Sequence, residues 1–137
     1  MKKQFTLGKD ERLKSRKQID HLFREGRSFT LFPYRVLFAI STRQPDSSAA
    51  IQFGIGVSTR HFKKAVDRNR IKRLSREAWR LQKNELTEVL TAKEKCLNVF
   101  FIFTGKELVA FTEVNEKIAG SIKKLKKLID EDLDPHP

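Results

Sequence analysis

A run of closely spaced basic residues from position 65 to position 80 is the part of the sequence best suited to chemistry. It reads Ala-Val-Asp-Arg-Asn-Arg-Ile-Lys-Arg-Leu-Ser-Arg-Glu-Ala-Trp-Arg. Guanidinium and ammonium groups donate charge-assisted hydrogen bonds to phosphate oxygens. Between positions 60 and 83 the sequence has ten Lys or Arg residues against two acids. Because like charges at this density repel one another unless a polyanion neutralises them, the run predicts a nucleic-acid-binding surface.

Helical periodicity places these charges on one side of a helix from about Val66 to Lys83. The apolar residues recur at the spacing of a core-facing stripe, namely Ile71, Leu74, Ala78 and Leu81. The opposite sector holds Asn69, Lys72, Arg73, Arg76, Arg80 and Lys83. Successive charges on such a face are about 5 to 6 Å apart, a spacing comparable to the phosphate repeat of a nucleic-acid strand. The alternative is a solvated charged face without a ligand, although such faces usually mix the two signs.

No catalytic residue and no metal site are predicted in this chain. The first predicted helix and the segment before it carry the acids Asp10, Glu11, Asp20 and Glu25, which have the character of surface charges. A two-metal nuclease needs acids that converge from strands, and the predicted strands contain none. The three histidines, His21, His61 and His136, have no His, Cys or acid at metal-ligand spacing. The composition therefore favours a protein that binds RNA over one that cleaves it.

Length and composition indicate one domain over residues 1–137, with a core from about 12 to 129 and a disordered tail from 130 to 137. The formal net charge is +12 and the pI is about 10.1, values typical of a protein with a phosphate-rich partner. We expect neither a membrane partner nor a signal peptide, because no apolar run is long enough. The single cysteine, Cys96, cannot form an internal disulfide, which fits a cytoplasmic location.

The elements that must position the basic run follow from apolar periodicity. A helix over residues 15–25 begins at Ser15 and ends at Gly26. Alternating patterns predict strands over 34–40 and 51–57, and the turn residues between them indicate an antiparallel hairpin. After the basic helix, residues 97–103 are apolar on both faces, which indicates a central strand. A last helix covers about 112–129. This order predicts an α+β sandwich, a small sheet packed with helices.

The chain resembles the protein subunit of bacterial ribonuclease P from about Arg12 to Leu128. The strongest match is the basic run, which is similar to the Arg-Asn-Arg signature helix of that family. Two further matches precede it in the family's order, the strand Gly54-Ile55-Gly56-Val57-Ser58 and the first helix, which ends in Leu22-Phe23-Arg24-Glu25-Gly26. The chain departs from the family in the loop over 59–65, which lacks the usual glycine, and at Ile19, where an aromatic residue is common.

The resemblance implies a fold with about four strands and a left-handed β-α-β crossover (ribosomal protein S5 domain 2-like). It also implies a function: the protein binds a catalytic RNA, and the complex removes the 5′ leader of precursor tRNA by endonucleolytic hydrolysis. The RNA would supply the active site with Mg2+, and no organic cofactor is expected. The expected partners are thus the ribonuclease P RNA and precursor tRNA, with no role for DNA or membranes.

Two groups of residues are predicted to contact these RNAs. The RNA-binding group comprises Arg60, Lys63, Lys64, Arg68, Asn69, Arg70, Lys72, Arg73, Arg76 and Arg80. By resemblance, the cleft for the single-stranded leader is lined by Arg12, Lys14, Ile19, Phe23 and Phe38. A structural RNA-binding protein of ribosomal type, without a part in cleavage, is the alternative. The order of the three matched motifs favours the ribonuclease P subunit.

Overall fold

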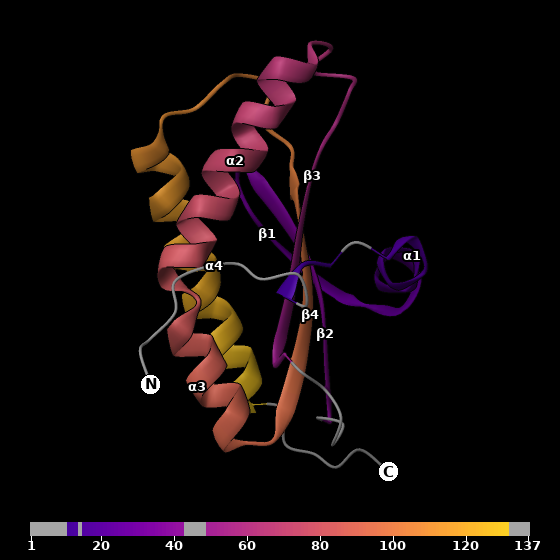
Figure 1. The fold of residues 1–137 in the computed structure, drawn as a ribbon, viewed down its shortest axis with the longest axis vertical. Coiled ribbons are helices and arrows are strands. Elements are labelled where there is room, and N and C mark those ends of the chain that lie inside the picture. The colour runs from indigo at the N-terminus through magenta and orange to yellow at the C-terminus, as the bar shows by residue number, and fades with distance from the viewer. Residues whose placement is uncertain (1–10, 14, 43–48, 132–137) are drawn as a thin grey trace.

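The computed structural model describes residues 11–13, 15–42 and 49–131, and within them the chain forms four helices and one four-stranded sheet. The elements in order are α1 (Arg16–Glu25), β1 (Arg27–Leu31), β2 (Tyr34–Thr42), β3 (Ile51–Val57), α2 (Ala65–Gln82), α3 (Asn84–Ala92), β4 (Lys95–Phe103) and α4 (Phe111–Glu131). Figure 1 shows α2, α3 and α4 on one side of the sheet and α1 on the other. The predicted α+β class is confirmed, and so are the five helix and strand regions predicted before and after the basic run.

The sheet order is β1-β2-β4-β3, so the predicted hairpin between residues 34–40 and 51–57 is wrong. The strand β4 lies between them, antiparallel to β2 and parallel to β3. The strand β4 therefore lies inside the sheet, which confirms the prediction of a central strand. That prediction was based on the apolar side chains on both faces of β4. The other neighbour of β2 in the sheet is β1, the strand that precedes it in sequence. The two strands pair antiparallel, and β1 was not predicted from the sequence.

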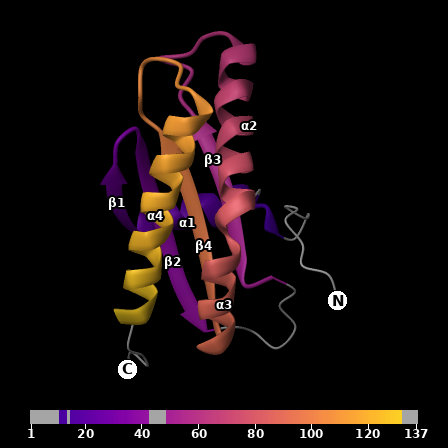
Figure 2. The same cartoon turned by 90° about the vertical axis from the view of Figure 1, so that its left-hand side faces the viewer.

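The connection from β3 to β4 through α2 and α3 is a left-handed crossover. In Figure 2 the helices face the viewer, both parallel strands run upward, and β4 lies to the left of β3. A crossover in front of the sheet that moves leftward between upward strands is left-handed, the opposite of the usual hand. The family resemblance implied this feature, which the general rule of handedness would have excluded.

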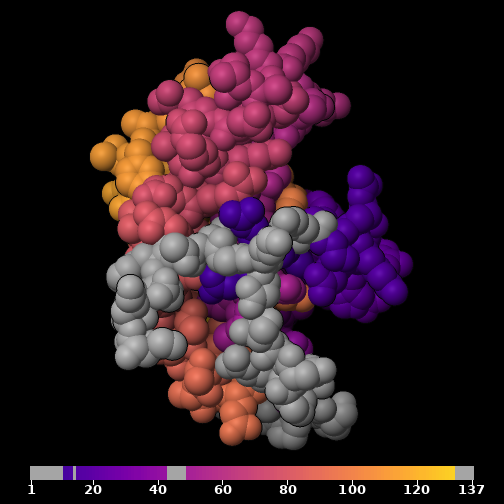
Figure 3. Space-filling view, in the orientation of Figure 1, coloured from indigo at the N-terminus to yellow at the C-terminus, as the bar shows by residue number. Residues whose placement is uncertain are grey.

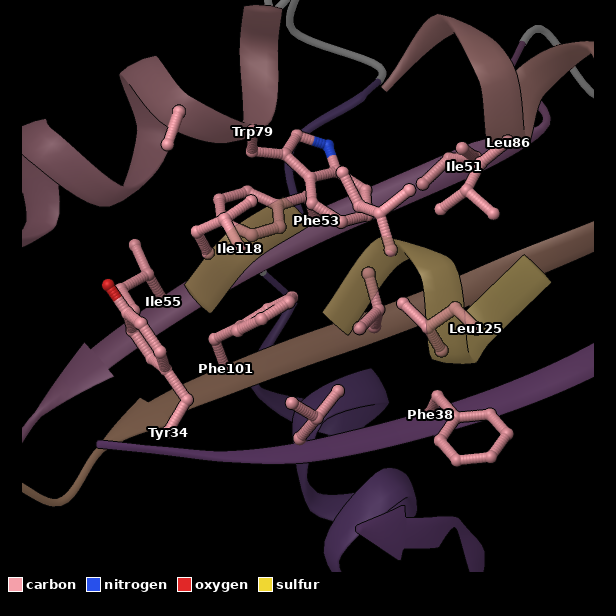
Figure 4. Close-up of a cluster of buried hydrophobic side chains, with 14 of the residues drawn as sticks. Tyr34, Phe38, Ile51, Phe53, Ile55, Trp79, Leu86, Phe101, Ile118 and Leu125 are labelled. Atoms are coloured by element: carbon pink, nitrogen blue, oxygen red, sulfur yellow. The ribbon is translucent and has the colours of Figure 1, made fainter. Parts of the chain in front are cut away.

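The main core lies between the sheet and the helices α2, α3 and α4. Trp79 of α2 stacks on Phe53 of β3 with ring centroids 4.7 Å apart, and Phe101 of β4 meets both rings. Figure 4 shows these side chains packed with residues of α4. Tyr34 shares a 2.6 Å hydrogen bond with Ser75, and burial raises the pKa of Tyr34 to about 12. The side of α2 that faces the sheet is therefore held in place by large and fully buried side chains.

Two residues at the end of α2 differ from the predicted helical stripe. Leu81, expected in the core, is 43% exposed, whereas Trp79 is fully buried in its place. Lys83, expected on the charged face, has a side chain only 4% exposed, with its Nζ 2.6 Å from the Glu11 carboxylate. The buried positions of α2 are Ile71, Ser75, Ala78 and Trp79, so its core face is centred closer to Trp79 than the predicted stripe, and Leu81, two residues further on, faces away from it. Lys83 follows the last residue of α2 and lies at the junction with α3.

The ends of the other helices agree with their sequence signals. The Ser15 hydroxyl oxygen accepts a hydrogen bond from the backbone N–H of Gln18 at the start of α1. At its end, a Cβ on Gly26 would lie 2.6 Å from the Leu22 carbonyl oxygen, a contact too close for any residue but glycine. The last helix runs to Glu131, two residues beyond the predicted end. The remaining part of the predicted disordered tail, 132–137, lies outside the described residues.

Candidate RNA interface

The outer side of α2 carries a basic face made of Asn69, Arg70, Lys72, Arg73 and Arg76. All of these side chains are exposed except that of Lys72, which is half-buried. Within the described part of the chain, the side chains of Arg70 and Arg73 make neither an ion pair nor a hydrogen bond. The opposite side of the helix is anchored by Ile71, Ser75, Ala78 and Trp79, all fully buried. The basic face thus presents unpaired guanidinium groups on a helix that cannot rotate.

Arg68 has a different role from its neighbours on the helix. Its Nη1 donates hydrogen bonds to the carbonyl oxygens of Phe62 at 2.7 Å and Lys63 at 2.9 Å. Phe62 is itself buried, with its ring 5.9 Å from that of Phe103. Arg68 therefore fixes the loop before α2. The predicted RNA-binding side chains of this loop are exposed: Arg60, Lys63 and Lys64.

Arg80 is paired within its own helix. Its Nη2 donates to the Glu77 carboxylate at 2.5 Å, and its Nε donates to the same carboxylate at 3.2 Å. This pairing lowers the pKa of Glu77 and raises the pKa of Arg80. Among the residues of the predicted RNA-binding group, Arg80 is the one whose charge is offset by an adjacent carboxylate, so we expect it to contribute least to phosphate binding.

The other side of the sheet carries a second candidate surface, formed around α1. Here Leu13, Leu22 and Leu37 form a small buried cluster. Around it lies what we call the α1-side surface, which consists of the partly covered apolar side chains Ile19, Phe23, Phe100 and Ile102. The ring of Phe23 is 51% exposed and lies 6.2 Å from that of Phe100 at an angle of 58°.

Two glycines of β3 make room for Phe100 on this surface. A Cβ on Gly54 would lie 2.6 Å from Cδ1 of Phe100, and one on Gly56 would lie 3.1 Å from its Cζ. The ring therefore lies over bare β3 backbone. A flat ring on a side-chain-free floor, with a second exposed ring beside it, is a surface on which unpaired bases can stack.

Phe38 does not belong to this surface, and its predicted place in the leader cleft is wrong. Its side chain is 1% exposed and lies in the main core, 5.9 Å from the ring of Phe29. Successive side chains of a strand point to opposite faces, and in β2 it is Leu37 and Ala39 that face α1. Figure 4 shows Phe38 beside α4, on the far side of the sheet from α1. The strand residues of the α1-side surface are Phe100 and Ile102 of β4.

Phe100 and Ile102 are residues of this surface that were not predicted from the sequence, and Phe100 is the aromatic one. Its signal is present in the strand over 97–103, which is apolar on both faces although only one face meets the main core. In β4 the side chains of Phe101 and Phe103 are buried under the helices, so Phe100 and Ile102 must face α1. The glycines at 54 and 56 in the neighbouring strand are the second signal, since bare backbone in a strand marks a close approach.

The segment 11–13 joins the two candidate surfaces. Arg12 pairs with Phe53 as an isolated parallel bridge, and the Leu13 amide donates to the Phe53 carbonyl oxygen at 2.8 Å. The Arg12 side chain is exposed at this edge of β3. Ile19 is half-buried against the small cluster, whereas Lys14, also predicted for the cleft, lies outside the described residues. In Figure 3 the indigo atoms of residues 11–13 lie between α2 and α1.

Among the described residues, no helix has the length and apolar character to span a membrane. Cationic groups on α2 suit phosphates, and aromatic groups on the α1-side surface suit bases.

Comparison with known proteins gives one family. A sequence model described as Ribonuclease P matches residues 7–126. The "Ribonuclease P protein component" of Porphyromonas gingivalis is 34% identical over 118 residues, which cover 86% of this chain and 85% of that protein. The protein of the same name from Nostoc punctiforme is 33% identical over 136 residues, covering 80% of this chain and 96% of that protein.

Solved structures agree with these sequence matches. The RNase P protein from Thermotoga maritima superposes with a TM-score of 0.64 at 29% identity, over 83% of this chain and 96% of that chain. The RNase P protein of Staphylococcus aureus has a TM-score of 0.66 at 19% identity, over 85% of this chain and 95% of that chain. The second likeness supports the fold only.

Proposed function

This chain belongs to the ribonuclease P protein family, and we propose that it binds the ribonuclease P RNA and the 5′ leader of precursor tRNA. In this proposal it is the protein component of a cytoplasmic ribonucleoprotein endoribonuclease that matures tRNA 5′ ends. The observation that carries the proposal is the basic face of α2, whose Arg70 and Arg73 are exposed and unpaired within the described residues.

The two surfaces would bind different parts of the RNA. The basic face of α2 and the fixed loop before it offer charges without stacking groups, which suits the phosphates of a folded RNA. The α1-side surface offers the rings of Phe23 and Phe100, which suit the unpaired bases of a leader of any sequence. Each stacked base contributes about 1 to 3 kcal/mol in comparable proteins.

Magnesium, in this proposal, is held by the RNA and its substrate. Mg2+ takes oxygen ligands, usually one or two carboxylates together with waters and substrate phosphates. No group of three His, Cys, Asp or Glu side chains among the described residues is placed to hold a metal ion. The two candidate surfaces, cationic and apolar, do not fit a resident magnesium site either. The protein's part is to neutralise phosphate repulsion, hold the leader and lower the magnesium concentration that the RNA needs.

The test is cleavage of precursor tRNA by the ribonuclease P RNA at limiting magnesium, with and without this protein. We expect the wild-type protein to restore cleavage at the mature 5′ end. The double variant Arg70→Ala/Arg73→Ala should not restore it, because it lacks two exposed charges of the basic face but keeps the buried anchors. Lys127→Ala, which removes one exposed charge on α4, serves as the control for a general loss of charge.

The rival function is structural RNA binding without a part in cleavage. It would be favoured if folded wild-type protein bound RNA but left cleavage unchanged at every magnesium concentration. Salt dependence tests the binding mode itself. If about five phosphates of irregular RNA are contacted, log affinity should fall against log salt with a slope of about −3.5, and a slope near zero would contradict both functions.

A further inference from the structure

The segment 11–13 passes from one side of the sheet to the other around the edge of β3. At its start, the Glu11 carboxylate lies 2.6 Å from Nζ of Lys83 at the end of α2. At its end, Leu13 is buried in the cluster beneath α1. Arg12 is the residue between them and is exposed at the crossing point.

Arg12 also continues the basic face of α2. Arg76 and Lys83 are seven residues apart and so lie on the same side of the helix. The segment covers this side at Lys83 and leaves Arg76 open. Partial desolvation and the nearby positive charge of Arg12 both lower the pKa of Arg76. Arg12 is the next residue after Glu11, which pairs with Lys83, and Arg76 lies two turns before Lys83 on the same side of α2. Two exposed guanidinium groups from distant parts of the chain thus face the same part of the surface.

The fold holds these two like charges together by contacts that do not involve either guanidinium group. These contacts are the Glu11–Lys83 ion pair, the 2.8 Å backbone hydrogen bond from Leu13 to Phe53, and the burial of the Leu13 side chain. Repulsion that is fixed in the free protein is relieved when an anion enters. A guanidinium group presents a planar fork of donors that matches the two free oxygens of a phosphodiester.

We propose that Arg12 and Arg76 form one binding site for a single RNA backbone phosphate. The site is located where the bound RNA strand would pass from the basic face of α2 to the α1-side surface. The site rests on the proposed function and specifies where one strand would cross the edge of the sheet. Glu11 is a positioning residue in it, because its ion pair with Lys83 fixes the segment that carries Arg12. The phosphate belongs either to the leader or to the ribonuclease P RNA.

A double-mutant cycle tests whether the two arginines share a phosphate. The variants are Arg12→Ala, Arg76→Ala and the combination, with Lys127→Ala as the charge-matched control. One arm measures affinity of the protein for ribonuclease P RNA alone. The other arm measures affinity of the assembled complex for precursor tRNA with and without its leader. The arm that responds identifies the source of the phosphate.

For a shared phosphate, each single variant should weaken binding about tenfold and reduce the salt slope by about 0.7. The combined variant should lose little more than either single variant, in affinity and in slope. Glu11→Gln should reproduce the slope change of Arg12→Ala, although Arg12 itself is intact, with thermal unfolding used to confirm that the variant is folded.

Independent, additive losses in the cycle would overturn the shared site, as would unchanged binding of both single variants in both arms. In either case the wild-type salt slope would still stand, and with it the proposed function. If the wild-type protein showed no salt-dependent binding to either RNA, the proposed function itself would fail.

Discussion

The two sides of the sheet differ in how completely their apolar side chains are covered. On the helix side Phe101 is fully buried and its ring meets those of Tyr34, Phe53 and Trp79. On the α1 side its neighbour Phe100 is half-buried beside the exposed ring of Phe23. One short helix cannot cover a face that three helices cover on the other side. The helix side therefore stabilises the fold, whereas the α1 side leaves apolar surface uncovered.

The two sides of the sheet should differ most in stability at two adjacent phenylalanines of β4. Phe101→Ala should lower the free energy of unfolding by about 3 to 5 kcal/mol, because it leaves a cavity in a fully packed core. Phe100→Ala removes the same side chain from a half-covered position and should cost clearly less. Urea unfolding of both variants measures the difference, and equal losses would show that the two sides contribute equally to stability.

Tyr34 makes the stability of the helix side sensitive to alkaline pH. Burial raises the pKa of this phenol from 10.0 to about 12, so the folded state favours the neutral form. The associated stability is present below pH 10 and is lost as pH rises from about 10 to about 12, by about 2 to 3 kcal/mol. Unfolding of wild type and Tyr34→Phe on either side of this range isolates the effect. An equal pH dependence in the two proteins would contradict it.

The glycine floor of the α1 side is tested by adding one methyl group. In Gly54→Ala the new Cβ would lie 2.6 Å from the Phe100 ring and 2.9 Å from the Leu13 carbonyl oxygen. We expect a loss of about 1 to 3 kcal/mol in stability as the ring and the segment shift. Gly56→Ala, where the nearest ring atom is 3.1 Å away, is the matched control and should cost less. Leader affinity should fall in the same order as stability.

The smallest effect on stability is expected for substitution of Phe23, although the same substitution should clearly weaken leader binding. Because its ring is 51% exposed, Phe23→Ala should change stability by less than about 1 kcal/mol. Loss of one stacked base should nevertheless weaken leader binding by about 1 to 3 kcal/mol. Affinity for precursor tRNA with and without its leader measures this. A stability loss as large as that of Phe101→Ala would end the distinction between the two sides.

Local patterns were sufficient to predict most elements but not their neighbours in space. Turn residues after β2 indicate that the chain reverses, and it does. They carry no information on whether the next strand pairs directly, and here β4 inserts between β2 and β3. The edge strand β1 was missed although Phe29 and Leu31 alternate with polar residues, because five residues hold only two apolar positions and are too few to establish a period of two.

The candidate site was predicted well where one helix decides it and less well where distant segments meet. The basic face follows from helical spacing alone, and its exposure is as expected. The choice between Phe38 and Leu37 depends on which side of the sheet each helix covers, and β2 is apolar on both sides. Lys83 and Arg68 differ from expectation because their partners, Glu11 and the carbonyl oxygens of the loop, are fixed by tertiary structure. That loop lacks the glycine common in the family, and Phe62 and Arg68 hold it in place.

The position of β4 in the middle of the sheet also governs the order in which the chain can fold during synthesis. The hairpin of β1 and β2 can form from adjacent segments, whereas β3 has no neighbouring strand among the sheet elements until residues 95–103 have left the ribosome. Until then the apolar residues of β3 and the buried face of α2 lack the strand β4 against which they pack in the folded protein. Such non-local pairing slows folding and leaves apolar segments open to aggregation.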